Sequence, residues 1–318
     1  MAWTIDEMGA YVQDEYIPGG FVDQVYKGMP AFVRLESRGG IKLDGGQNVR
    51  QSVTVEELPG GTYTGLGNFN TSVVETDTFI QLPWRHYHAD LTISKTTLGL
   101  VSSRKAAGNY LENKMGAAKR RLQKDVETDL GLHNTWGTGT AIDGLQLAID
   151  DTTNATNYGQ VDRSVVTRLK GNPNYTGGPV SLPMIGTAYD LASVSNNSSP
   201  DLALTTRVIV RKLKNILQPQ DRMLRDSRHQ DLVSTGYDGV QFERMAIVAC
   251  DYFPSGMMFL LNTEYIKVFI HSDFHFVLDK KDGWKQPLGQ SALVNQILFW
   301  VNIICQSPRS QAIITNMT

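Results

Sequence analysis

The chain has 318 residues, of which 41% are hydrophobic and 19% are charged, and its net charge is −2. This length accommodates one large domain or two smaller ones. The balanced charge excludes a long-range attraction to nucleic acid, membrane surfaces or acidic substrates. The absence of any apolar run of about 18 residues excludes a membrane-spanning helix. The N-terminus carries acids where a secretory signal carries bases, so we expect a protein made in a cytosol.

The first 43 residues predict a polar N-terminal arm. Thr4–Gln13 favours a short helix, because Thr4 is a good N-cap and Glu7 follows three residues later. Such arms are poorly ordered unless a partner holds them. We therefore expect residues 1–43 to lie on another surface, and other copies of the chain are the natural candidates.

Residues 44–95 predict a long two-stranded hairpin. The stretch 47–57 alternates valines with polar residues, which is typical of a half-buried strand. The returning strand is predicted over 78–94, where Pro83 indicates an edge or a bulge because it lacks a backbone donor. An isolated two-stranded ribbon is only marginally stable in water. A neighbouring copy is therefore expected to cover the valine face, and the predicted intersubunit anchors are Val49, Val53, Val55 and Trp84.

Residues 96–133 predict a long charged helix, beginning at Thr97 and ending near His133. Its apolar positions recur every three or four residues, which indicates one buried stripe. The residues expected to form the core of this helix, against a sheet that includes residues 293–305, are Leu111, Met115, Leu122 and Val126. The opposite, polar face is predicted to contain Glu127 and several bases.

The remainder mixes helices and strands and predicts an α+β fold. Residues 205–217 favour a helix that ends before Pro219. Strands are predicted over 245–250, 257–261, 265–271, 293–305 and 311–316. Cys250 and Cys305 both lie in apolar runs, which indicates buried free thiols.

No motif in the chain predicts catalysis. His86 with His88, and His271 with His275, have the spacing of paired ligands but lack the fixed geometry of a metal motif. We interpret them as polar strand residues facing solvent or a neighbour, and expect no catalytic residue, metal or cofactor. A cytosolic metal-dependent enzyme that uses these pairs remains an alternative. The basic clusters 119–124 and 207–214 are interpreted as solvated or intersubunit faces rather than phosphate contacts.

Three segments carry a resemblance to a known family: PDLALTTRVIVRKLKNILQPQ, CDYFPSGMMFLLNTEYIKVFIH and NQILFWVNIICQSPRSQAIITN. The loop GLQLAIDDTTNATNYGQVDR adds to them. With the arm, hairpin and long helix in this order, the chain resembles the major capsid proteins of tailed double-stranded-DNA bacteriophages, of the Hong Kong ninety-seven type. The resemblance covers nearly the whole chain, and it rests on the order of the elements.

The resemblance implies an N-arm (1–43), an extended E-loop hairpin (44–95) and a spine helix of the peripheral domain (96–133). It further implies an axial domain (134–261) and a return of the chain to the peripheral sheet (262–318). It implies self-assembly through hexamers and pentamers into an icosahedral head around phage DNA. Separate scaffolding, portal and cement proteins are the implied partners. The implied location is the virion, after assembly in the host cytoplasm, and an encapsulin-like compartment is the alternative.

Two departures from the founding member of this family bear on mechanism. That member links its subunits through an E-loop lysine and an asparagine of a neighbour. Here no lysine occurs between Lys42 and Lys95, so Asn295, near the expected acceptor position, has no donor. We therefore expect no autocatalytic crosslink. No long helical scaffolding segment precedes the arm, so scaffolding is expected from a separate protein or from a segment already removed.

Overall fold

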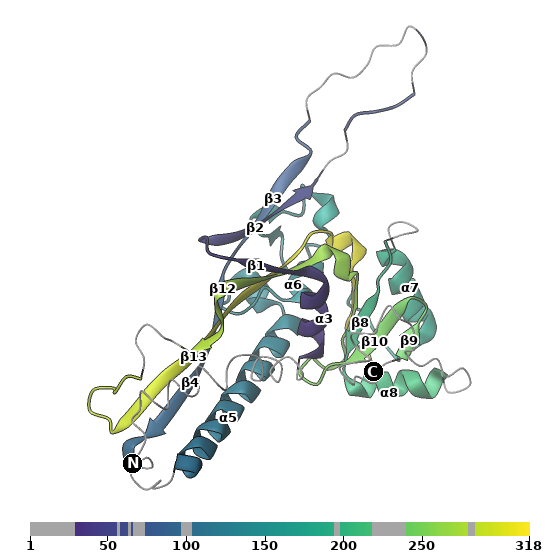
Figure 1. Ribbon diagram of the computed structural model, residues 1–318. Helices are drawn as coiled ribbons and strands as arrows, with labels where there is room; N and C mark the ends of the chain where they lie inside the picture. The colour runs from purple at the N-terminus through teal and green to yellow at the C-terminus, as the bar shows by residue number, and fades with distance from the viewer. Residues whose placement is uncertain are drawn as a thin grey trace.

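The computed structural model describes residues 29–55, 58–62, 65, 74–96, 104–193, 198–217, 240–278 and 284–318. Within them the chain forms two main sheets joined by helices, and a narrow hairpin projects from the body (Figure 1). The predicted α+β class is confirmed. None of the described helices is both long enough and apolar enough to span a membrane.

A four-stranded sheet with the order β1-β12-β13-β4 forms one half of the molecule. The long strands β12 and β13 are antiparallel, and β13 pairs with β4 along ten residues, from Arg85 opposite Val301 to Ser94 opposite Ala292. The bounds are β1 (Gly40–Leu43), β12 (Ile266–Leu278), β13 (Ala292–Cys305) and β4 (Arg85–Ser94).

A six-stranded sheet with the order β7-β14-β11-β8-β10-β9 forms the other half. Helices α7 (Leu182–Ala192) and α8 (Arg207–Leu217) pack on it. The strands are β7 (Asn172–Asn174), β14 (Ala312–Ile314), β11 (Met258–Leu261), β8 (Leu202–Thr205), β10 (Met245–Ala249) and β9 (Val240–Phe242).

The shorter elements lie outside the two main sheets. The hairpin consists of β2 (Asn48–Thr54) and β3 (Asp77–Pro83). A second small ribbon consists of β5 (Asn157–Tyr158) and β6 (Val161–Asp162). The remaining helices are α3 (Pro30–Gly39), α6 (Leu145–Ile149) and the 3-10 turns η2 (Asn134–Gly137), η3 (Thr167–Leu169), η6 (Thr263–Tyr265) and η7 (Pro308–Ser310).

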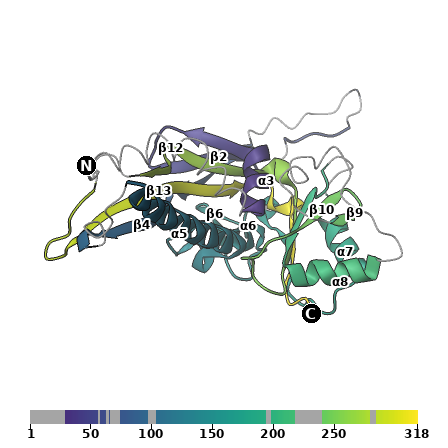
Figure 2. The ribbon, with the colours of Figure 1, turned by 60° about the horizontal axis from the view of Figure 1, so that its bottom comes forward.

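The long helix α5 (Arg104–Gly131) lies along the four-stranded sheet (Figure 2). Its predicted core residues Met115, Leu122 and Val126 are buried, as the periodicity predicted, whereas the side chain of Leu111 lies outside the described residues. The strand directly beneath the helix is β4, and β13 lies next to β4. The predicted start at Thr97 also lies outside the described residues.

The returning strand of the hairpin is not continuous, which corrects the prediction for 78–94. Strand β3 ends at Pro83, and β4 begins at Arg85 in a different sheet, paired with β13. Proline lacks a backbone donor, so Pro83 cannot extend the ladder. The hairpin is therefore shorter than 44–95, and its second half belongs to the body.

The valine face of the hairpin base is covered by the same chain, which is a second correction. Val49, Val53 and Trp84 are buried within the subunit, so the prediction that they are intersubunit anchors is wrong. The β5–β6 turn supplies the cover: Gln81 donates its backbone N–H to Gly159 O at 2.9 Å. Gly159 has φ +57°, and a Cβ there would lie 2.2 Å from Ile80 Cγ2. Val55 is only half-buried, and its role stays a prediction.

The end of the predicted arm belongs to the body as well. Ala31, Phe32 and Leu35 of α3 are fully buried, and β1 pairs in parallel with β12. Apolar side chains in the 29–43 stretch thus find their cover in this subunit rather than on a neighbour. The helix predicted for Thr4–Gln13 lies outside the described residues.

The sequence predicts that the whole stretch 262–318 returns to the four-stranded sheet, but not all of its strands join that sheet. β12 and β13 do, but β14 pairs with β11 and β7 of the six-stranded sheet. The 3-10 turn at Pro308–Ser310 redirects the chain between the two sheets. The last strand therefore fastens the two halves together.

We expect Leu122→Ala to lower the free energy of unfolding by about 2–5 kcal/mol, because it removes a fully buried side chain and leaves a cavity. Urea denaturation measures the difference. Lys124→Ala, on the exposed face of α5, is the matched control and should change stability by less than about 0.5 kcal/mol. Equal stability of L122A and the parent chain would contradict the placement of α5.

Candidate functional site

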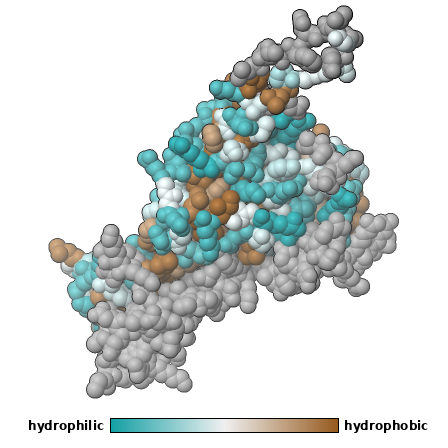
Figure 3. All heavy atoms as spheres, turned by 45° about the horizontal axis from the view of Figure 1, so that its top comes forward, coloured by the Kyte–Doolittle hydropathy of each residue, from teal (hydrophilic) through white to brown (hydrophobic). Residues whose placement is uncertain are grey.

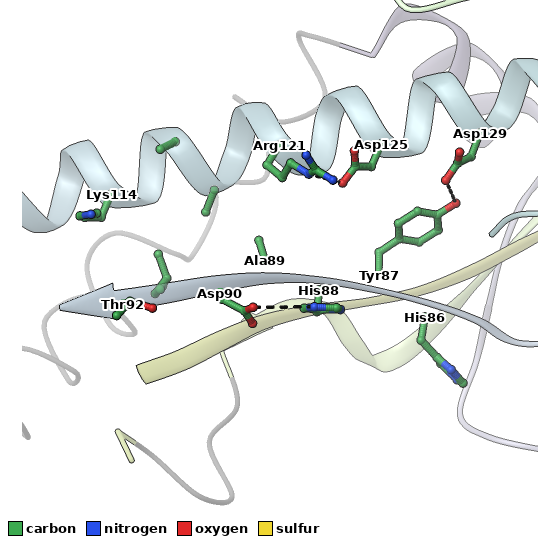
Figure 4. A pocket seen from close by; sticks show the side chains of 13 residues that line it. His86, Tyr87, His88, Ala89, Asp90, Thr92, Lys114, Arg121, Asp125 and Asp129 are labelled. Atoms are coloured by element: carbon green, nitrogen blue, oxygen red, sulfur yellow. Dashed lines mark hydrogen bonds and ion pairs between the residues drawn. The ribbon is translucent and has the colours of Figure 1, made fainter. Parts of the chain in front are cut away.

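A groove of about 800 Å³ runs between β4 and α5 (Figure 4). Because side chains alternate along a strand, Tyr87 and Ala89 point toward the helix, whereas His86 and His88 lie on the other side of the strand. His88 lies 3.8 Å from Asp90 on that side. The two histidines thus do not meet the acids of α5.

The charged groups in this groove are paired with one another. The Tyr87 hydroxyl donates to Asp129 Oδ2 at 2.8 Å and accepts the backbone N–H of Ile142 at 2.9 Å. Burial raises the pKa of Asp129, and the bond from Tyr87 opposes that rise. Arg121 Nε lies 2.6 Å from Asp125 Oδ2. The groove presents a largely polar surface. Its lining residues do not include a free base beside a nucleophile.

The two members of the second histidine pair lie in different aromatic surroundings. His271 is part of a cluster with Trp84, Phe274 and Trp300, whereas His275 lies near Phe276 and Phe299. The His271 ring lies 5.4 Å from Trp84 and 5.2 Å from Trp300, and it is only 7% exposed. The expectation that His271 faces solvent or a neighbour is therefore wrong, because three aromatic rings cover it. His86 packs on Trp300 from the adjacent strand at 4.3 Å.

The histidines do not gather with other ligating side chains. Among the described residues, no three side chains of the ligating types His, Cys, Asp and Glu lie together. Burial, and then the charge of Lys42, lower the pKa of His275 to about 4. Burial and Arg85 lower the pKa of His86. Both shifts favour the neutral ring.

Asp143 is the centre of a buried polar network that joins three segments. Arg85 on β4 binds it with Nη2 at 2.9 Å and Nε at 3.2 Å. Asn134 donates to Oδ1 at 2.6 Å, and Asn302 on β13 donates to Oδ2 at 2.8 Å. The Nδ2 of Asn302 also donates to Pro83 O, at the point where the hairpin ends. This Asp143 network fixes the hairpin base, the exit of α5 and the sheet relative to one another.

A second network holds the loop that follows α6. Asp150 accepts backbone N–H groups from Thr152 and Ala155 at 3.1 and 2.9 Å, and the hydroxyl of Tyr175. These bonds lower the pKa of Asp150 although burial opposes them. Arg163 is fully buried, lies 3.7 Å from Asp150 and donates to the carbonyl of Leu147. Apart from Arg163 Nε, which has no hydrogen-bond partner among the described residues, these polar groups are bonded to one another, which indicates a structural role.

Glu127 was predicted on the polar face of α5, and the structure corrects this. It is 1% exposed, and its Oε1 accepts the backbone N–H groups of Ala31 and Phe32 at 3.2 and 3.4 Å. The N–H groups of a first helical turn have no acceptor within their own helix, and a carboxylate there is favourable. Oε2 has no hydrogen-bond partner among the described residues. Burial outweighs the two bonds and raises the pKa of Glu127 to about 8.

The two cysteines are free and buried, as predicted. Burial raises the pKa of Cys305 to about 12 and that of Cys250 well above its ordinary value. Thiols of this kind are inert, because the thiolate is the reactive form.

The basic clusters differ in their surroundings. Arg120 and Lys124 of α5 are exposed, and Arg207 of α8 is bound to Asp251. Arg211 and Lys212 are also exposed on α8.

Glu127, Asp143 and Arg163 were not identified from the sequence. Glu127 directly follows the apolar position Val126, and this adjacency to the buried stripe was the only local signal. For Asp143 and Arg163 the partners lie in distant parts of the chain, so no spacing pattern marks them.

Neither a family profile nor a curated protein matches the chain. The capsid asymmetric unit of cyanophage A-1(L) has a TM-score of 0.65 and 13% identity, and the alignment covers 96% of each chain. The chain has the Hong Kong ninety-seven type fold.

Other solved structures with this fold come from two kinds of assembly. The holo encapsulin complex from Synechococcus elongatus has a TM-score of 0.60 at 7% identity, covering 91% of this chain and 87% of that one. A structure from Gordonia phage Cozz has a TM-score of 0.56 at 12% identity, with 91% and 87% covered. At these identities the likeness establishes the Hong Kong ninety-seven type fold and leaves the activity to be argued separately.

Asp143→Ala should lower the free energy of unfolding by about 3–5 kcal/mol, because it leaves the Arg85 guanidinium buried without its counter-charge. Chemical denaturation followed by circular dichroism checks this. Asp44→Ala, at an exposed turn, is the control. A loss no larger than that of D44A would show that the Asp143 network contributes little.

Glu127 predicts a pH dependence of stability. Its pKa is about 8 in the fold and near 4.5 in the unfolded chain, so between these values the folded form holds a proton that the unfolded form releases. The free energy of unfolding therefore falls as pH rises from about 4.5 to about 8. Glu127→Gln keeps an oxygen acceptor for α3 and removes this titration.

The measurement is urea denaturation of both chains at pH 5 and at pH 8. Relative to the parent, E127Q should gain more than about 1 kcal/mol between the two pH values, since one pKa unit corresponds to about 1.4 kcal/mol. The same difference at both pH values would mean that Glu127 is ionised in the fold throughout.

Proposed function

We propose that this chain is the subunit of a closed protein shell, and specifically the major capsid protein of a tailed double-stranded-DNA bacteriophage. The observation that carries the proposal is the likeness to a chain of the cyanophage A-1(L) capsid asymmetric unit, which covers 96% of both chains. In this proposal the four-stranded sheet with α5 is the peripheral domain, and the six-stranded sheet with α7 and α8 is the axial domain. Copies assemble through hexamers and pentamers without catalysis.

The projecting hairpin supports a role in assembly. It extends from the body (Figure 1), and the strands β2 and β3 carry exposed residues between their buried ones. Phe79 on β3 is 63% exposed, and Leu58 beyond β2 is 74% exposed. Exposed large apolar groups on a projecting element indicate an interaction site. We propose that Phe79 and Val55, rather than Val49 and Val53, contact the neighbouring subunit.

The surface below the hairpin supplies a second candidate contact. Figure 3 shows a group of hydrophobic residues amid a mostly hydrophilic surface below the hairpin. Weak contacts of this kind add up across a closed shell, because each subunit engages several neighbours at once.

An encapsulin-like compartment is the second candidate, favoured by the likeness to the Synechococcus elongatus encapsulin complex. The two candidates differ in contents. A phage head encloses DNA, assembles in the host cytoplasm with separate scaffolding, portal and cement proteins, and makes only weak, non-specific contacts with that DNA. An encapsulin shell encloses protein cargo.

Electron microscopy of the purified chain, alone and with lysate of its source, tests the shell proposal. We expect closed polyhedral particles or rings of subunits. Nuclease digestion and mass spectrometry of the particle contents then separate the candidates: protected double-stranded DNA supports the phage head, and a co-purified enzyme supports the encapsulin. A uniform monomer under all conditions would refute both.

Assembled particles should give a single monomer band on a denaturing gel, because the segment between Lys42 and Lys95 has no lysine to form an isopeptide bond. Particles treated with glutaraldehyde are the positive control and should give a ladder. A covalent ladder from untreated mature particles would contradict the prediction.

A further inference from the structure

Helices α7 and α8 lie at different places on the six-stranded sheet. α7 packs against β7, β14 and β11, toward one end of the strand order, whereas α8 packs against β10, toward the other end. Figure 1 shows the two helices set apart on this half of the molecule. Each buries one face in the same core, α7 through Ile185 and α8 through Leu213.

Both helices expose aliphatic side chains on their outer faces. Leu191 of α7 is 61% exposed, and Val208 and Ile216 of α8 are 55% and 42% exposed. A single exposed aliphatic residue is ordinary. Val208 and Ile216 lie eight residues apart and therefore on one side of α8, with the exposed Lys212 between them, so this side is both aliphatic and basic.

The charges beside these aliphatic groups have opposite signs. On α8 the exposed bases Arg211 and Lys212 lie between Val208 and Ile216, and on α7 the exposed acid Asp190 precedes Leu191. In the part of the chain that the structure describes, no ion pair engages these three side chains. The outer face of α7 is thus acidic and apolar, and that of α8 is basic and apolar.

We propose that the outer face of α8 in one copy docks on the outer face of α7 in the next copy, with Arg211 and Lys212 opposite Asp190 and the aliphatic groups between them. This contact rests on the proposed shell function and names its partner surface. The occupant is a second copy because the two faces carry opposite charges and both offer exposed aliphatic groups that the contact would bury.

The pairing also limits the symmetry. A contact of α8 with α8 would bring like charges together, which disfavours a two-fold contact made by α8 alone. When each copy uses α8 toward one neighbour and α7 toward another, the contact is head-to-tail, and it closes into a ring when the rotation between copies divides a full turn. Rings of this kind are what a shell of hexamers and pentamers requires.

Charge exchange tests the interface. Asp190→Lys should place like charges at the contact, and Lys212→Glu should do so from the other side. Each variant should raise the protein concentration needed for assembly about tenfold or more, and sedimentation velocity measures this concentration. The combined variant D190K/K212E restores opposite charges and should recover most of the parent assembly. The thermal melts of the subunits should be unchanged, because both side chains are exposed.

Matched controls are Asp44→Lys and Lys124→Glu, which reverse exposed charges elsewhere on the molecule. Normal assembly of both single variants, or a combined variant no better than either, would overturn the interface while leaving the shell proposal intact. If K212E alone impairs assembly and the combined variant does not restore it, the basic face of α8 contacts phosphate instead. That outcome would also overturn the proposed interface. A parent chain that never assembles would refute the shell proposal itself.

Discussion

The buried carboxylate of Asp143 is the constraint on which the arrangement of the molecule depends. A charge in this position is tolerated only if it is fully paired and hydrogen-bonded. Its partners come from β4, from the turn after α5 and from β13. Satisfying one carboxylate therefore brings together the hairpin base, the end of the long helix and the central strand of the four-stranded sheet.

The α3 helix performs a comparable task between the two halves. Its first turn donates to Glu127 on α5, and its Arg34 lies 3.7 Å from Asp201 beside β8. Asp201 also accepts from the backbone and hydroxyl of Thr263, after β11. The helix thus links the long helix of one half to the sheet of the other through polar contacts. With β14, it makes the two halves one body.

These internal networks leave the outer surfaces for assembly. Most polar groups of the Asp143 and Asp150 networks are hydrogen-bonded within the chain, with Asn134 Oδ1 and Arg163 Nε as exceptions among the described residues, and the thiols are buried. The outer elements, in contrast, expose apolar surface together with charges of opposite sign that form no ion pair among the described residues. That distribution suits a protein whose contacts are made with copies of itself.

The sequence alone determined several elements that have one buried face, because periodicity records that face directly, although it did not predict α3 or α7. The stripe Met115, Leu122 and Val126, the apolar strands of both sheets and the buried cysteines follow from it. Tertiary structure decided where each element goes. Strand β4 leaves the hairpin at Pro83, β14 joins the other sheet, and Val49, Val53 and Trp84 are covered by their own chain. Glu127, Asp143 and Arg163 find partners far away in the sequence, and a local pattern contains no information about a distant partner.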